Sequence, residues 1–159
     1  MRHKVLSSLI VALLFSFGLA AGVAYAPYHT TPTPPPSTPS SPSGLSAAQA
    51  QAKVAAAHGG FAAEGGTVSY VHEHIGHTLA CIEGATGKNV NAAWENPCQG
   101  MGNGVLPDLE RANASASLIE KAKTADAAAV SAMKNNGLAQ TKASAKQVST
   151  LMKEIAEAK

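Results

Sequence analysis

The sequence predicts an all-α fold, an antiparallel four-helix bundle with a long, disulfide-tied loop between helices 2 and 3. Aromatic residues make up only 4% of the chain and charged residues only 14%, while alanine is abundant. Alanine is the best helix former and a poor strand former, and its small side chain suits closely packed helices. Beyond residue 45, apolar residues recur at steps of three and four, as on one face of a helix. The length of 159 residues indicates a single domain.

The first 26 residues have the pattern of an export segment. A basic start, MRHK, precedes an uncharged apolar run over residues 5–26. Small residues at 24 and 26 predict a cleaved signal peptide, although Pro27 would follow this cut and a cut before Tyr25 is the alternative. The run is also long enough to span a bilayer as an uncleaved anchor. Either way, we expect the rest of the chain to be exported, periplasmic or extracellular.

Residues 27–44 form a linker rich in proline, threonine and serine. They hold seven of the nine prolines of the chain. Such a composition cannot build a packed core and favours an extended, disordered spacer. It would be a stalk behind an anchor, or a tail after cleavage, and residues 45–159 form the helical domain.

We expect the first hairpin to consist of helices over about 46–63 and 67–83. Thr67 is the expected N-cap of the second helix. The buried face of this helix is predicted to carry Val68, Val71, Ile75, Leu79 and Ile82.

The second hairpin is predicted over about 107–135 and 138–158, joined by the stop signal NNG at 135–137. Pro107 suits a first helical turn, and a break near Thr124 is an alternative. The apolar positions expected to face the core are Leu118, Ile119, Ala122, Ala129, Val130, Met133, Leu138, Ala145, Val148, Met152 and Ile155.

Between the hairpins lies a loop over about 84–106, rich in glycine and asparagine. Cys81 and Cys98 are the two cysteines of the chain, and an even count in an oxidising compartment predicts a disulfide. Such a bridge would stabilise the fold by roughly 3 kcal/mol. The alternative, a pair of thiolate metal ligands, needs a reducing environment. Trp94 is expected to cover one end of the bundle.

The stretch VHEHIGHTLACIEG, residues 71–84, carries three of the six histidines. A helix turns about 100° per residue, so His72 and His74 point about 160° apart and cannot bind one ion together. Two metal sites are therefore predicted, a superficial pair of His74 and His77 or an interhelical pair of His58 and His72. Imidazole suits copper, zinc and nickel. The alternative is that these histidines are solvated or boundary residues without a metal.

Other classes of function are disfavoured. The net charge is +2 and falls to zero without residues 1–26, which argues against nucleic-acid binding and against electrostatic docking on a membrane. GATGKN lacks the glycine spacing of a phosphate loop, and the chain has no CxxCH motif for c-type haem. No Ser/His/Asp arrangement stands out, so we do not expect an enzyme. The sequon at Asn113 falls on a predicted helix and reads as a chance match.

The segments AAQAQAKVAAAH, HEHIGHTLACIEG and KTADAAAVSAMKNNGLAQTKASAKQ resemble the small metal-binding proteins of bacterial periplasms. The resemblance covers about 45–159 in general style and implies an exported, alanine-rich helical bundle that binds divalent metals such as copper. His72, His74 and His77 stand at positions of the kind that family uses. Because residues 82–159 contain no histidine, we expect a low metal capacity.

The leading prediction is an exported binding protein for a divalent transition metal of the copper or zinc type. It would use His74 and His77, helped by His58 or His72. The alternative is a metal-independent structural or interaction domain, displayed on the proline-rich stalk, that recognises a protein partner through residues 84–106. Membrane attachment is expected only if residues 5–26 remain uncleaved.

Overall fold

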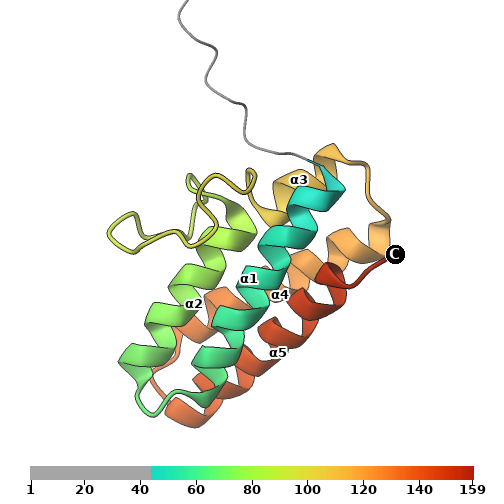
Figure 1. The fold of residues 1–159 in the computed structure, drawn as a ribbon. Helices are drawn as coiled ribbons and strands as arrows, with labels where there is room; N and C mark the ends of the chain where they lie inside the picture. Colours follow the sequence, from blue (N-terminus) through green and yellow to red (C-terminus); the bar gives the residue numbers. More distant parts are fainter. Residues whose placement is uncertain (1–43) are drawn as a thin grey trace, which may run out of the picture. The chain divides into compact units, whose positions relative to one another are not determined.

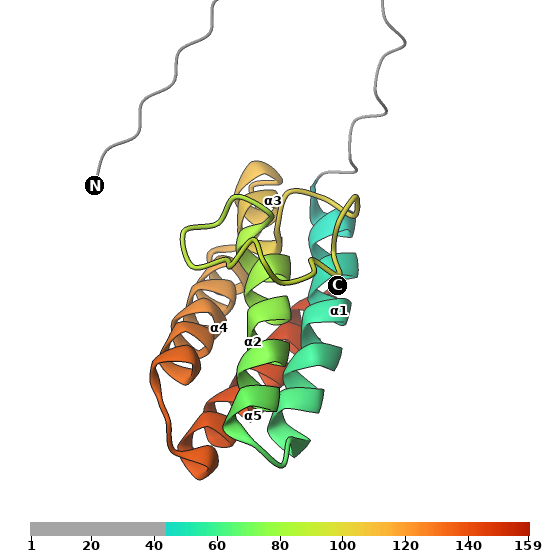
Figure 2. The ribbon, with the colours of Figure 1, turned by 90° about the vertical axis from the view of Figure 1, so that its left-hand side faces the viewer.

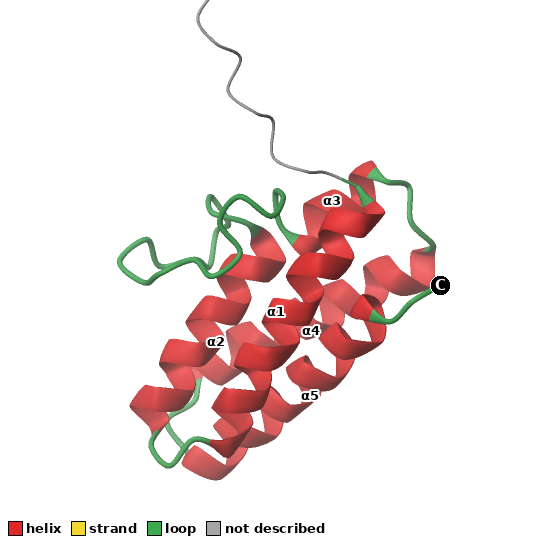
Figure 3. Ribbon diagram, in the orientation of Figure 1, coloured by secondary structure: helices red, strands yellow, loops and turns green. Residues whose placement is uncertain are grey.

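A computed structural model describes residues 44–159, and this part of the chain is entirely helical and without strands (Figures 1 and 3). The predictions for the export segment and for most of the linker lie outside it. Within residues 44–159, no helix combines the length and the apolar character needed to cross a bilayer. The five helices of this described part are α1 Leu45–Glu64, α2 Val68–Glu83, α3 Val105–Arg111, α4 Ala116–Lys134 and α5 Leu138–Ala156.

The predicted number of helices, four, is wrong because the third one is interrupted. A single helix was expected over about 107–135, but α3 ends at Arg111 and α4 begins at Ala116. Asn113 has a φ of 49°, in the left-handed region that a continuing α-helix cannot adopt. The break also does not lie near Thr124, whose hydroxyl donates to the Glu120 carbonyl within α4.

The four long helices enclose the core. Helix α1 packs against α2 and α5, and α4 packs against α5 and α2 (Figures 1 and 2). The predicted apolar face of α2 is confirmed, with Val68 alone left half-buried. The fully buried large apolar side chains are Val71, Ile75, Leu79, Ile82, Val105, Leu109, Val148, Met152 and Ile155.

On α4 the core is made of alanine. The larger apolar residues of this helix, among them Leu118, Ile119, Val130 and Met133, are only half-buried against the core. A stripe of small side chains lets a neighbouring helix backbone approach more closely than leucine would allow. The alanines of α4 with no exposed surface are Ala122, Ala125, Ala129 and Ala132.

The long loop between α2 and α3 is held to the helices by a disulfide. Cys81 and Cys98 form the predicted bridge, with their Cα atoms 5.2 Å apart, and both are buried. Trp94 does not cover an end of the helices as expected, because its ring lies on the side of α2 at Gly76. A Cβ atom at position 76 would stand 1.9 Å from the ring, so glycine is required for this contact.

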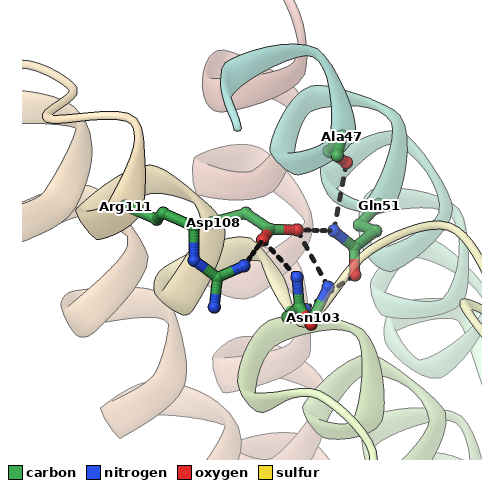
Figure 4. Close-up of polar contacts among 6 residues, drawn as sticks. Ala47, Gln51, Asn103, Asp108 and Arg111 are labelled. Atoms are coloured by element: carbon green, nitrogen blue, oxygen red, sulfur yellow. Dashed lines mark hydrogen bonds and ion pairs between the residues drawn. The ribbon is translucent and has the colours of Figure 1, made fainter. Parts of the chain in front are cut away.

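A buried carboxylate fixes the far end of this loop (Figure 4). Asp108 on α3 has no exposed surface and accepts hydrogen bonds from the Gln51 amide (2.9 Å) and from the Asn103 backbone and side-chain nitrogens (both 2.9 Å). Arg111 forms an ion pair with it at 3.4 Å. Gln51 in turn accepts from the Gly104 N–H at 2.9 Å. One carboxylate therefore joins α1, the loop and α3.

A second carboxyl group, on Asp126 of α4, lacks such partners. Its Oδ1 is buried and has no hydrogen-bond partner among residues 44–159. Burial raises the pKa of Asp126 to about 6, the neighbouring Glu83 carboxyl adds to the rise, and Lys88 opposes it. Between pH 3.8 and about pH 6, Asp126 is therefore protonated in the folded protein and ionised in the unfolded chain.

We predict that Asp108→Asn lowers the free energy of unfolding by about 3 kcal/mol, since an amide in this place turns N–H groups toward donors and leaves the guanidinium of Arg111 without its partner. Denaturant unfolding with the disulfide intact measures this loss. Glu110→Gln, at an exposed site on the same helix, is the control and should change stability by less than about 0.5 kcal/mol. A similar small loss for Asp108→Asn would contradict the role of the network.

The stabilising effect of a protonated Asp126 is fully present below its unfolded pKa and is lost as the pH rises through its folded pKa of about 6. We therefore predict that Asp126→Asn, which stays neutral, is more stable than wild type by about 1 kcal/mol at pH 7.5, after allowance for solvent screening. At about pH 3, below the unfolded pKa of 3.8, the two proteins should be equally stable. Thermal unfolding across this range, with Glu120→Gln as the exposed control, tests it. An advantage that does not vary with pH would rule out the titration.

Candidate metal site

Three histidines from two helices meet in the structure. His58 comes from α1, and His74 and His77 come from adjacent turns of α2. Each imidazole places one ring nitrogen within 4.8 Å of a ring nitrogen of each of the other two. The Nδ1 atoms of His58 and His74 are 3.1 Å apart, and the ring centre of His77 lies 4.9 Å from that of His58. All three residues are half-buried, so an ion among them would be shielded but reachable.

The antiparallel α1–α2 hairpin sets this meeting point. The Thr78 hydroxyl on α2 is 3.4 Å from the Ala55 carbonyl oxygen on α1, which places these residues at the same level. Moving three residues along α1 and about four back along α2 brings His58 level with His74. The i and i+3 spacing then puts His77 on the same side of α2.

His72 lies on another side of α2 and does not pair with His58, contrary to the expected interhelical pair. Its Nε2 is 3.1 Å from the Ala132 carbonyl oxygen and 3.0 Å from that of Asn135, at the end of α4. Carbonyls only accept, so Nε2 carries the hydrogen and donates. His72 thus serves α4 as a hydrogen-bonding cap, while His58, His74 and His77 form the cluster. The angle of about 160° predicted between His72 and His74 agrees with this division.

The charge on the cluster is kept low by its surroundings. Burial lowers the pKa of His58, and the neighbouring His77 and His74 lower it further, while Glu95 opposes them. Burial also lowers the pKa of His74, with a further contribution from His77 and opposition from Glu73. The hydrogen bond between His58 and His74 needs a bare nitrogen on one ring. At neutral pH His58 and His74 are therefore in the uncharged form that binds metals.

The lack of a partner for the Nδ1 of His77 is the observation that most directly suggests a bound ligand. This nitrogen is buried and has no hydrogen-bond partner within the described part of the chain. Nearly all buried polar atoms in proteins are paired, and a bound ion is one reason for an exception. An ion bound through Nδ1 would give this nitrogen a partner.

The spacing of the nitrogens fits a transition metal. With bonds of about 2.0–2.1 Å, two imidazole nitrogens on a tetrahedral ion stand about 3.3 Å apart. The 3.1 Å between His58 and His74 is close to this value. The third nitrogen lies within 4.8 Å of the other two. Three imidazoles leave one coordination position open, and Cys81 is not free to fill it because it is in the disulfide.

Two aromatic side chains flank the outer side of the cluster. The Phe61 ring centre is 5.7 Å from that of His58 and 5.4 Å from that of His74. Tyr70 packs on His74 at 4.5 Å. Both rings remain exposed, Phe61 at 49% and Tyr70 at 43%. These ring contacts restrict the orientations that the imidazoles of His58 and His74 can adopt.

On the other side of His77 lies a surface pocket of about 740 Å³. It opens between α2, the long loop and the end of α4. Its polar lining includes His72, Glu73, His77 and Glu95, and its apolar lining includes Trp94 and Met133. Glu95, Phe61 and Tyr70 were not among the predicted site residues, because no spacing in the sequence relates the loop or the exposed aromatics to the histidines.

No family model, curated protein or solved structure matches this chain. The resemblance to the small periplasmic metal-binding proteins therefore stays a prediction.

We predict that His77→Ala raises the pKa of both His58 and His74, because it removes a neighbouring positive charge and admits water. Titration of the imidazole Cε1–H signals by NMR in metal-free buffer measures both values. His72→Gln, on the other side of α2, should leave them unchanged. Unaltered or lower pKa values in His77→Ala would show that the three rings do not interact.

Proposed function

We propose that this protein is an exported binding protein for one divalent transition-metal ion, held by His58, His74 and His77. The observation that carries the proposal is the convergence of three half-buried imidazoles, one with a buried nitrogen that has no partner in the described part of the chain. Neutral imidazoles suit copper, zinc and nickel, while calcium and magnesium prefer oxygen ligands. Export is supported by the basic, then apolar, pattern of the first 26 residues.

One ion per chain is the expected capacity. Four histidines lie within residues 44–159, and the hydrogen bonds of His72 to α4 leave three for the cluster. The open coordination position would let the ion be passed to or from another ligand. Binding or transfer of the metal, and no chemical conversion, is the proposed role.

We predict that calorimetric titration with Cu(II) or Zn(II), with the disulfide intact, finds one site. His58→Ala, His74→Ala and His77→Ala should each weaken binding by at least about tenfold. His72→Gln is the matched control, because it removes a histidine from the same helix but keeps a donor for the α4 carbonyls. A saturating metal should also raise the unfolding temperature of the wild type.

The only tryptophan, Trp94, provides a second measurement. Its ring and His77 line the same pocket, so paramagnetic Cu(II) should quench its fluorescence in step with the calorimetric saturation. Equal affinity in all four histidine variants would overturn the site.

A rival role is a metal-independent interaction domain that uses residues 84–106 to recognise a protein partner. It is favoured by the exposed residues 91–93, which lie in a loop held by the disulfide and by the Trp94 contact. Absence of metal binding in the wild type, with partner capture lost on scrambling residues 91–93, would favour this role over the first.

A further inference from the structure

A small hollow at the turn between α1 and α2 is lined by two exposed aromatic side chains. Its volume is about 190 Å³, and its lining consists of Phe61, Glu64, Gly65, Gly66 and Tyr70. Within residues 44–159, the exposed large apolar side chains are Leu45, Phe61 and Tyr70, so two of these three meet in one place. A single exposed apolar residue is ordinary, whereas exposed apolar residues gathered in a concave place indicate a ligand or partner site.

The two rings are held in place before any ligand arrives. Tyr70 packs on the His74 ring with centres 4.5 Å apart, and the Phe61 ring centre lies 5.4 Å from that of the same imidazole. Tyr70 also covers Gly65, where a Cβ atom would stand 2.8 Å from the tyrosine ring. Since these side chains are already ordered, binding a ligand between them costs little conformational entropy.

Glu64 supplies the one charged side chain among the residues that line the hollow. It is the last residue of α1 and stands three positions after Phe61, so both side chains leave the helix on the same side. Lys146 lines another surface pocket together with Glu64, but within residues 44–159 the ion pairs do not include Glu64. A carboxylate at the C-terminal end of a helix does not stabilise that helix, so the stability of α1 does not explain this residue.

Two aromatic rings beside an unpaired carboxylate attract an organic cation. The face of an aromatic ring is electronegative and attracts a cation within about 6 Å of its centre. Because both ring centres lie within 5.4 Å of the centre of His74, one cation between them is within reach of both.

The lining also indicates which kind of cation fits. A primary ammonium needs acceptors for three N–H groups, while a quaternary ammonium needs none and is attracted to aromatic rings. The volume is below the roughly 300–1,000 Å³ of pockets for drug-sized ligands. The hollow therefore suits a compact head group.

We propose that Phe61, Glu64 and Tyr70 form a binding site for an alkylated ammonium group, such as a trimethylammonium head group. This site goes beyond the proposed metal-binding function and does not rest on it. The group is carried either by a small molecule or by a methylated lysine side chain of a partner protein, and the two sources are separated by experiment.

The test is an NMR titration of the full chain, disulfide intact, in metal-free buffer, with choline and with its uncharged carbon isostere dimethylbutanol. Choline should shift the amide signals of Gly65 and Gly66 saturably, and the isostere should bind at least about fivefold more weakly. Equal affinity for both compounds would show a purely apolar site. That result, or the absence of saturable shifts with choline, would overturn the proposal.

Variants identify the residues that bind the cation. Phe61→Leu, Tyr70→Leu and Glu64→Gln should each weaken choline binding about two- to fivefold, the loss expected for one contact at an exposed site. Tyr70→Phe is the matched control, because it keeps the ring and should bind like wild type. Glu110→Gln, which removes an exposed carboxylate from α3, should also bind like wild type. Circular dichroism checks that helix content is retained, and unchanged affinity in the first three variants would overturn these residues as the site.

A short peptide with one trimethyllysine, compared with the same peptide carrying unmodified lysine, identifies the source of the group. Tighter binding of the trimethylated peptide than of choline would assign the site to a protein partner, and the reverse order would assign it to a small molecule. If the unmodified peptide binds as tightly as the trimethylated one, the site does not recognise alkylation and the proposal is wrong.

Discussion

The fully buried carboxylate of Asp108 is the constraint on which the rest of the domain depends. A charge without water must be satisfied by donors, and here they come from α1 through Gln51, from the loop through Asn103, and from Arg111 on α3 itself. The loop has few apolar residues of its own to bury. Its place against the helices is therefore set by polar contacts and by one covalent bond, the Cys81–Cys98 disulfide.

The position of this loop has consequences for the histidine cluster. The loop segment before Cys98 can pack against α2 because Gly76 has no side chain, which leaves room for the ring of Trp94. That contact brings the pocket wall, including Glu95, next to His77. The histidine cluster takes its three nitrogens from α1 and α2. The loop beside it is positioned by the Asp108 network at its end and by the contact of Trp94 with Gly76 in its middle.

The alanine-rich core explains why the imidazoles are so close. On α1 the residues facing the core are small, with Ala52, Ala55 and Ala62 completely buried. Helices packed on alanine approach closely, and His58 and His74 then reach hydrogen-bonding distance across the hairpin. The same close packing excludes water, which lowers the pKa of His58 and His74. The Nδ1 of His77 is buried there without a partner among residues 44–159. A core of large side chains would hold these helices too far apart for such a cluster.

The sequence by itself determined the helical class, the apolar face of α2, the Thr67 cap and the cysteine pairing, because periodicity, capping and cysteine count are local or compositional signals. It also determined that His72 and His74 point to different sides of α2, since the angle follows from helix geometry alone. Only the tertiary structure decided which side faces α1, and hence that His58 joins His74 and His77 while His72 bonds to α4. The break at Asn113 has local signals, an asparagine in the left-handed region and Ser115 as the next N-cap. The place of Trp94 was decided by its contact with Gly76, between residues distant in the chain, which no local pattern encodes.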